Sequence, residues 1–131
     1  MESFNVNTKK RREFIEITDE IKNIIKKSDV KNGICIVFVP HTTCGLTINE
    51  NADSSVKEDI LFKLKELIPE NVGYSHLEGN SDAHISSSIL GHSLTLIIGN
   101  NSILLGPWQG IFLCEFDGPR TRKILLEVIQ K

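Results

Sequence analysis

The chain is poor in cysteine and has no long apolar run. Its three cysteines, Cys35, Cys44 and Cys114, are an odd number without a Cys-x-x-Cys spacing, which argues against a disulfide framework and a thiolate zinc knuckle. Free thiols of this kind predict a cytoplasmic location. No apolar run approaches the about 20 residues that span a bilayer, and the polar N-terminus lacks a signal segment. We therefore expect neither export nor a membrane span.

An excess of charge of either sign is also missing. The chain has 15 Lys and Arg against 17 Asp and Glu, for a formal net charge of -2. The one basic run, residues 9–12, lies between two alternating apolar segments, which predicts a solvated hairpin turn rather than a binding stripe. Nucleic acid is therefore not an expected partner.

What the sequence does contain is enough apolar residues for one core. With 131 residues, 40% of them hydrophobic, we expect a single domain over residues 1–131. Alternation at 4–8 and 14–17 predicts a hairpin, and the apolar run 34–39 predicts a central strand buried on both faces. A further strand is expected over 41–49, and four more over 93–98, 103–105, 109–116 and 122–129.

Helical periodicity appears in three places. The predicted helices cover 18–28 with Thr18 as cap, 53–68 with a cap among Asp53 and the two serines after it, and 81–90 with Ser81 or Asp82 as cap. Strands at both ends, with the helices grouped between strand segments, favour an α+β fold. The architecture predicted is a mixed or antiparallel β-sandwich rather than a doubly wound sheet.

Histidines suggest a metal site. His76 and His84 are the two ends of a nine-residue run at a junction of loop and helix, and His41 lies at a strand junction. Imidazole is the commonest metal ligand in proteins, so these three side chains are candidates for a catalytic divalent metal. The residue types suit zinc, manganese, nickel or iron, with zinc as the first candidate. Three separately hydrogen-bonded histidines are the alternative.

A phosphate site is a second interpretation of the same segment. Gly79 and the free amides at the start of the following helix are typical of anion binding. The nearby carboxylate of Asp82 opposes an anion unless a cation bridges the two, which favours a metal-bound phosphate or diphosphate. Arg120 is a candidate for clamping phosphate oxygens, whereas Arg122 is expected to be a solvated hairpin residue.

Two further side chains are candidates for catalysis. Glu115 lies in an apolar strand, which predicts burial with a partner and leaves a role in acid-base chemistry open. Cys44 follows His41 by three residues, as a cysteine-histidine pair would require. In an extended chain, however, these two side chains point to opposite faces, which disfavours a thiol nucleophile.

Four blocks of sequence resemble the YjbQ family of small proteins, members of which are also named secondary thiamine-phosphate synthase enzymes. They are HTTCGLTINENAD at 41–53, HLEGNSDAH at 76–84, LGPWQGIFL at 105–113 and EFDGPR at 115–120. The resemblance implies an α+β sandwich that assembles as a homotrimer. It also implies a site that includes His41, His76, Glu78, Asn80 and His84, with Thr43, Glu115 and Arg120 as second candidates.

The activity that the resemblance implies joins a hydroxymethylpyrimidine diphosphate to a thiazole phosphate with release of diphosphate. We expect a metal-assisted enzyme acting on a small phosphorylated metabolite, with His41, His84 and Glu115 as catalytic residues. Substrate contacts are expected from five residues, Thr43, Glu78, Gly79, Asn80 and Arg120. The alternatives are a metal-dependent phosphohydrolase and a noncatalytic trimer that binds a metal or metabolite.

Overall fold

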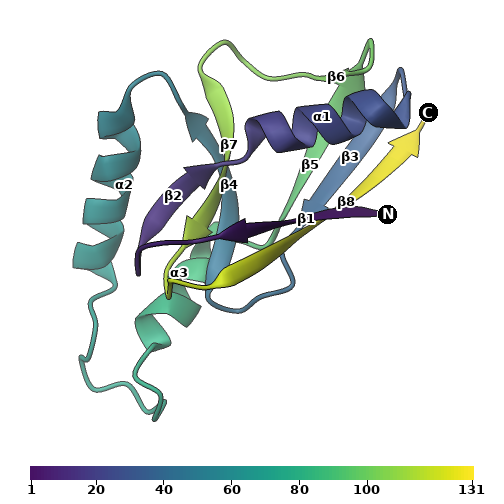
Figure 1. The fold of residues 1–131 in the computed structure, drawn as a ribbon. Helices are drawn as coiled ribbons and strands as arrows, with labels where there is room; N and C mark the ends of the chain where they lie inside the picture. The colour runs from purple at the N-terminus through teal and green to yellow at the C-terminus, as the bar shows by residue number, and fades with distance from the viewer.

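The computed structural model describes residues 1–131 and contains eight strands and three helices (Figure 1). In chain order these are β1 (Glu2–Asn7), β2 (Glu13–Glu16), α1 (Thr18–Ser28), β3 (Gly33–Phe38), β4 (Cys44–Glu50), α2 (Ser54–Leu67), α3 (Ser81–Leu90), β5 (Ser93–Gly99), β6 (Ser102–Ile103), β7 (Gln109–Glu115) and β8 (Thr121–Gln130). One sheet has the order β1-β8-β3-β5-β6 and the other the order β2-β7-β4. Every pairing is antiparallel, so the predicted α+β class is confirmed.

The main core lies between the two sheets and α1. The inner face of the five-stranded sheet contributes Cys35, Val37 and Leu96 among others, and α1 adds Ile21 and Ile25. The three-stranded sheet closes this core from the other side. Burial of this apolar surface is the main force that holds the two sheets together.

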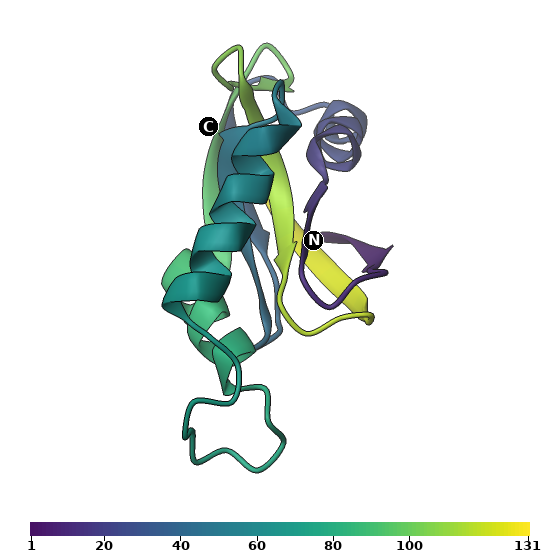
Figure 2. The ribbon, with the colours of Figure 1, turned by 90° about the vertical axis from the view of Figure 1, so that its left-hand side faces the viewer.

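A second, smaller core lies on the opposite face of the three-stranded sheet. Phe112 and Phe116 pack there with Phe14, against Ala83 of α3 and Ile60 of α2. Figure 2 shows α2 running along this side of the molecule, with the 68–80 loop projecting beyond the end of the helix. None of the three helices combines the length and the apolar character that crossing a membrane requires.

The predicted N-terminal hairpin is wrong. β1 pairs with β8 in one sheet, whereas β2 pairs with β7 in the other. The basic segment between β1 and β2 therefore crosses from sheet to sheet instead of turning back. Alternating residues indicate a strand but not its partner, because the same pattern fits any register with one buried face.

Burial of β3 on both faces is also wrong. Cys35 and Val37 are fully buried, but the alternate residues Ile34 and Ile36 are only partly covered. β7 is the strand enclosed on both faces, because Ile111 and Leu113 face the main core while Phe112 and Cys114 face the helices. The outer face of β3 is left apolar and without a covering layer.

Helix limits agree closely with expectation, but two of the three caps do not. Asp53 caps α2 by accepting a hydrogen bond from the Ser55 amide at 2.9 Å. Thr18 caps nothing, since its hydroxyl donates to Glu16 and accepts from the Ile111 amide. The cap position of α3 is Asn80, which makes no side-chain cap bond.

Candidate functional site

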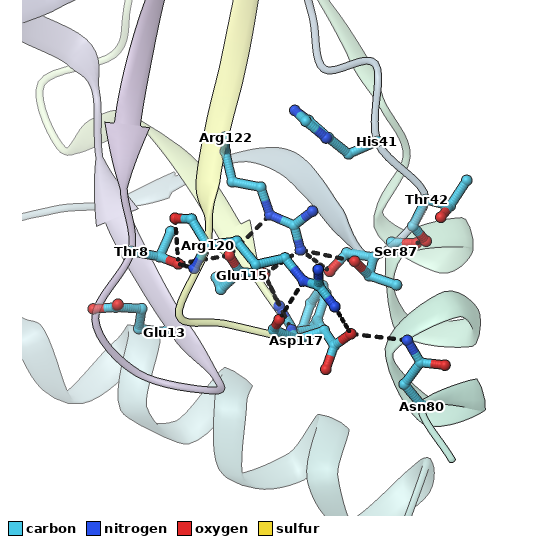
Figure 3. Close-up of polar contacts among 12 residues, drawn as sticks. Thr8, Glu13, His41, Thr42, Asn80, Ser87, Glu115, Asp117, Arg120 and Arg122 are labelled. Atoms are coloured by element: carbon cyan, nitrogen blue, oxygen red, sulfur yellow. Dashed lines mark hydrogen bonds and ion pairs between the residues drawn. The ribbon is translucent and has the colours of Figure 1, made fainter. Parts of the chain in front are cut away.

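A polar chamber of about 350 Å³ opens where the two sheets meet α3. Its lining residues come from the loop after β3, the segment that leads into α3, α3 itself, the turn before β8 and the start of β8 (Figure 3). None of the nine is a hydrophobic core residue: Pro40, His41, Thr42, Thr43, Glu78, Asn80, His84, Arg120 and Arg122. Six of the site residues expected from the sequence are thus gathered here, namely His41, Thr43, Glu78, Asn80, His84 and Arg120.

A buried ion pair between the sheets lies beneath the chamber, and only its arginine reaches the lining. Glu115 of β7 and Arg122 of β8 both point inward, and Arg122 donates from Nε to Glu115 Oε1 at 2.9 Å. A second bond runs from Arg122 Nη2 to Glu115 Oε2. Arg122 is only 3% exposed, so the expectation of a solvated hairpin arginine is wrong.

Surrounding groups form further hydrogen bonds with both members of this pair. Glu115 also accepts from the Thr8 hydroxyl at 2.8 Å and from the amides of Phe116 and Asp117. Arg122 Nη2 donates to Thr43 Oγ1 at 2.8 Å. Burial of Glu115 with a partner is therefore confirmed, and its carboxylate is fully occupied in holding the guanidinium rather than lining the chamber.

His41 is held by the backbone of β8. Its Nε2 accepts a hydrogen bond from the Lys123 amide at 2.9 Å. Partial burial lowers the pKa of His41, and the positive charge of Arg122 lowers it further. Both causes favour the neutral imidazole.

His76 and His84 lie in contact with each other. Their ring centroids are 5.3 Å apart with the planes nearly perpendicular. His84 lines the chamber from the first turn of α3, whereas His76 does not and has its Nε2 4.0 Å from Glu78 Oε1. The junction of loop and helix thus brings the two rings together as the spacing suggested.

Asn80 and Asp117 link the loop before α3 to the turn before β8. Asn80 Nδ2 donates to Glu78 Oε2 and to Asp117 Oδ2, each at 2.8 Å. Partial burial opposes ionisation of Asp117, but bonds from Asn80 and Arg120 outweigh it and lower its pKa. The side-chain amide oxygen of Asn80, Oδ1, is buried and has no partner in the chain.

Gly79 and Asp82 lie outside the chamber. Gly79 has φ of +82°, a conformation that favours glycine. Asp82 is fully buried and paired with Arg11 and Arg12, so the basic run is not a solvated turn. The cations beside Asp82 are therefore two guanidinium groups, which fasten the segment between β1 and β2 to the start of α3.

The metal donors predicted from the sequence do not lie as one cluster. No three His, Cys, Asp or Glu side chains are arranged to hold a metal ion. His76 and His84 touch, but the Nε2 lone pair of His41 is occupied by the Lys123 amide. As these side chains lie, the set of His41, His76 and His84 does not fit a three-ligand site.

The thiol of Cys44 does not face the chamber either. It is buried in the main core, and burial raises its pKa to about 11. A thiol that stays protonated is a poor nucleophile. The strand-geometry argument against a cysteine nucleophile therefore agrees with its placement.

Fold and chamber together define a small α+β protein with two antiparallel sheets and a polar cavity between them. The chain belongs to the family described as UPF0047 protein YjbQ-like, whose match covers residues 2–131. A UPF0047 protein of Methanocaldococcus jannaschii is 55% identical over 126 residues, covering 96% of this chain and 91% of the relative. The UPF0047 protein YugU of Bacillus subtilis is 42% identical over 130 residues, covering 98% of each.

Solved structures agree with this membership. An uncharacterised conserved protein of the YjbQ/UPF0047 family from Clostridium acetobutylicum superposes with a TM-score of 0.96 at 46% identity, covering 98% of this chain and all of the other. A YbjQ-like protein of unknown function from Sulfolobus solfataricus gives a TM-score of 0.95 at 35% identity, covering 99% and 96%. The family that the four sequence blocks suggested is thereby confirmed.

Proposed function

We propose that the chamber binds the phosphate or diphosphate group of a small metabolite, and that the protein is an enzyme acting on that group. The observation that carries this proposal is that the Arg122 guanidinium is held in place by the chain and still has one nitrogen free to donate. Nε and Nη2 are bound to Glu115 and Thr43, but Nη1 has no partner in the chain and is not sealed from solvent. A buried, preoriented donor of this kind suits an oxyanion.

Two cationic donors in the chamber lining also support an anionic ligand. Arg120 and Arg122 both line it, and the carboxylates of Glu115 and Asp117 are already bonded to these two arginines. The ion pairs hold the cations in place and balance their charge, and Glu78 adds a carboxylate to the lining, so the support for an anion is the fixed position of the donors and not a net positive charge. A phosphate would meet preorganised donors, which lowers the free energy of reorganisation on binding.

The family resemblance supplies one concrete reaction, thiamine-phosphate synthesis. In this version Arg120 and Arg122 neutralise charge on the diphosphate as its bond to the pyrimidine methylene breaks. A ring nitrogen of the thiazole phosphate forms the new bond to that carbon. His84, which lines the chamber and has no side-chain hydrogen bond within the chain, donates a proton to the diphosphate oxygen that leaves the methylene carbon.

The experiment is a product assay with both substrates and with each alone. Diphosphate release that requires hydroxymethylpyrimidine diphosphate and thiazole phosphate together, with thiamine phosphate formed, supports the synthase. Release from the pyrimidine diphosphate alone supports a phosphohydrolase instead. Binding of both substrates without turnover would favour the noncatalytic alternative and overturn the enzyme proposal.

A divalent metal, with zinc as the first candidate, remains a separate proposal. It rests only on the residue types of His41, His76 and His84, which do not lie as one cluster in the structure, and no step above depends on it. Elemental analysis of protein purified without a histidine tag tests it, beside a variant with all three changed to alanine. Near-stoichiometric metal that is lost in a folded variant would support the site, and metal-free protein with full activity would overturn it.

A homotrimer is the assembly that we propose from the resemblance. The outer face of the five-stranded sheet supports an assembly of copies, because Ile97, Ile34 and Ile129 lie side by side on three neighbouring strands. Two of these, Ile97 and Ile129, are at least 45% exposed, and such a patch is typical of an interface. Light scattering coupled to size exclusion measures the mass.

The cytoplasmic location stays a prediction. It is supported by three buried free cysteines.

A further inference from the structure

The loop after β3 places an imidazole at the point where a β-ladder ends. β3 and β8 pair as far as Phe38 and Leu125, and beyond this pair the chain of β3 turns away. The amide of Lys123, two residues before Leu125 in β8, therefore has no β3 carbonyl to bind. His41 Nε2 accepts this amide at 2.9 Å and takes the place of the missing ladder partner.

This bond determines which ring nitrogen carries the proton. A backbone amide can only donate, so Nε2 must present its lone pair and hold no proton. The remaining proton of the neutral ring is then on Nδ1. His41 Nδ1 makes no hydrogen bond in the chain and is not sealed from solvent, so it is a free donor.

His41 and Arg122 therefore present unused donors to the same chamber. Both line it, and Figure 3 shows the imidazole on the side of the guanidinium that carries no bond to Glu115. Nη1 of Arg122 is the second free donor. Two N–H donors from separate elements suit one tetrahedral oxyanion, which has an oxygen for each.

We propose that His41 is a fixed hydrogen-bond donor, which holds a phosphate oxygen through Nδ1–H together with Nη1 of Arg122, and is neither the proton-transfer group nor a metal ligand. This inference rests on the phosphate site proposed above. Protonation of Nε2 would place its N–H against the N–H of the Lys123 amide. The amide therefore opposes repeated gain and loss of a proton by this ring. The proton-transfer role falls to His84 alone.

The first experiment measures the tautomer without any ligand. Two-bond proton-nitrogen correlation spectra of the imidazoles, assigned with a His41→Asn variant, identify the protonated nitrogen of His41. We expect Nδ1–H as the dominant form. A dominant Nε2–H form, or a rapid mixture of both, would overturn the proposal even if phosphate binds in the chamber.

The second experiment uses two variants that each replace one ring nitrogen. The amide nitrogen of His41→Asn lies where Nδ1 was, whereas His41→Gln carries its amide at the position of Nε2. With inorganic phosphate as the probe, we expect His41→Asn to stay within about 3-fold of the parent dissociation constant and His41→Gln to weaken binding by about 10-fold or more. The same two changes at His92, which does not line the chamber, are the matched controls.

The possible results separate the two proposals. Equal loss in both His41 variants would overturn the donor role and leave the phosphate site standing. Absence of phosphate and diphosphate binding in the parent protein would overturn the phosphate site, and the holding of an oxyanion by His41 with it. In that case an Nδ1–H tautomer would still exclude His41 as the proton-transfer group.

Discussion

Glu115 and Arg122 belong to different sheets, yet the Nε of Arg122 lies 2.9 Å from Oε1 of Glu115. Each residue lies on the inward face of its strand, at the end of the sandwich where apolar packing stops. The pair therefore joins the sheets and positions the one guanidinium nitrogen that remains free. The packing of the two sheets and the proposed binding of phosphate therefore depend on the same contact.

Replacing Glu115 with Gln should lower the free energy of unfolding by about 3 kcal/mol or more, because Arg122 keeps its charge and loses its counterion in a buried position. Urea unfolding followed by circular dichroism measures the change. Glu127→Gln is the matched control, since Glu127 is exposed on the same strand as Arg122 and should change stability by less than about 0.5 kcal/mol. Equal stability in both variants would contradict the anchoring role of the pair.

Replacing Arg122 with Lys should weaken phosphate binding by about 10-fold or more, because an ammonium group cannot bond Glu115, Thr43 and a ligand with the fixed geometry of a guanidinium. Titration calorimetry with inorganic phosphate measures the affinity. Arg120→Lys serves for comparison, and we expect a smaller loss because Arg120 is about half exposed. A larger loss at Arg120 would move the main phosphate contact to that residue.

Replacing His84 with Ala should abolish turnover in the two-substrate assay while the fold survives, because this ring lines the chamber without a structural bond. The rate of diphosphate release reports the activity, and thermal unfolding reports the fold. His92→Ala is the control outside the chamber. Full activity in the folded His84 variant would remove it from the mechanism.

Acid should remove a stabilising contribution from Asp82. Burial alone would raise its pKa, but hydrogen bonds from Arg11 and Arg12 outweigh burial and lower the pKa below 3.8. A carboxyl group with a lowered pKa in the folded state stabilises it above pH 3.8 and loses this contribution as pH falls through the folded pKa. Unfolding free energies measured from neutral pH downward should converge for the parent and Asp82→Asn, and parallel curves would contradict this.

Replacing Ile97 with Asp should dissociate the proposed trimer, because it places a charge in the row of isoleucines on the outer face of the sheet. Ile97 is 59% exposed, so the fold of the single chain should tolerate the change. Light scattering measures the mass of the variant. A parent protein that is monomeric, or a variant of unchanged mass, would contradict assembly through this face.

The fold class and the limits of the helices could be predicted because they depend on local periodicity. Residues 18–28 and 81–90 are helical as expected, since a period of about 3.6 residues shows in a short window. The pairing of β1 with β8 could not be predicted. It joins segments more than a hundred residues apart, and the alternation of apolar and polar residues along β1 would fit several partner strands.

The candidate site was predicted only in part, because some of its contacts are local in the sequence and others join distant segments. His76 and His84 were paired correctly because their contact depends on a short loop. Arg122 was missed because its role depends on Glu115, on another sheet. Alternation along β8 offered a signal, since Arg122, Ile124 and Leu126 share one buried face, and an arginine on such a face needs a buried partner.

The strand order of the five-stranded sheet also bears on how the site comes into existence. β8 lies between β1 and β3, two strands that precede it by most of the chain, so neither can complete its ladder until β8 inserts. Such long-range pairing is slow to form. Arg122 and the amide that orients His41 both arrive with this strand, and we expect ligand recognition to be the last property that a refolding molecule acquires.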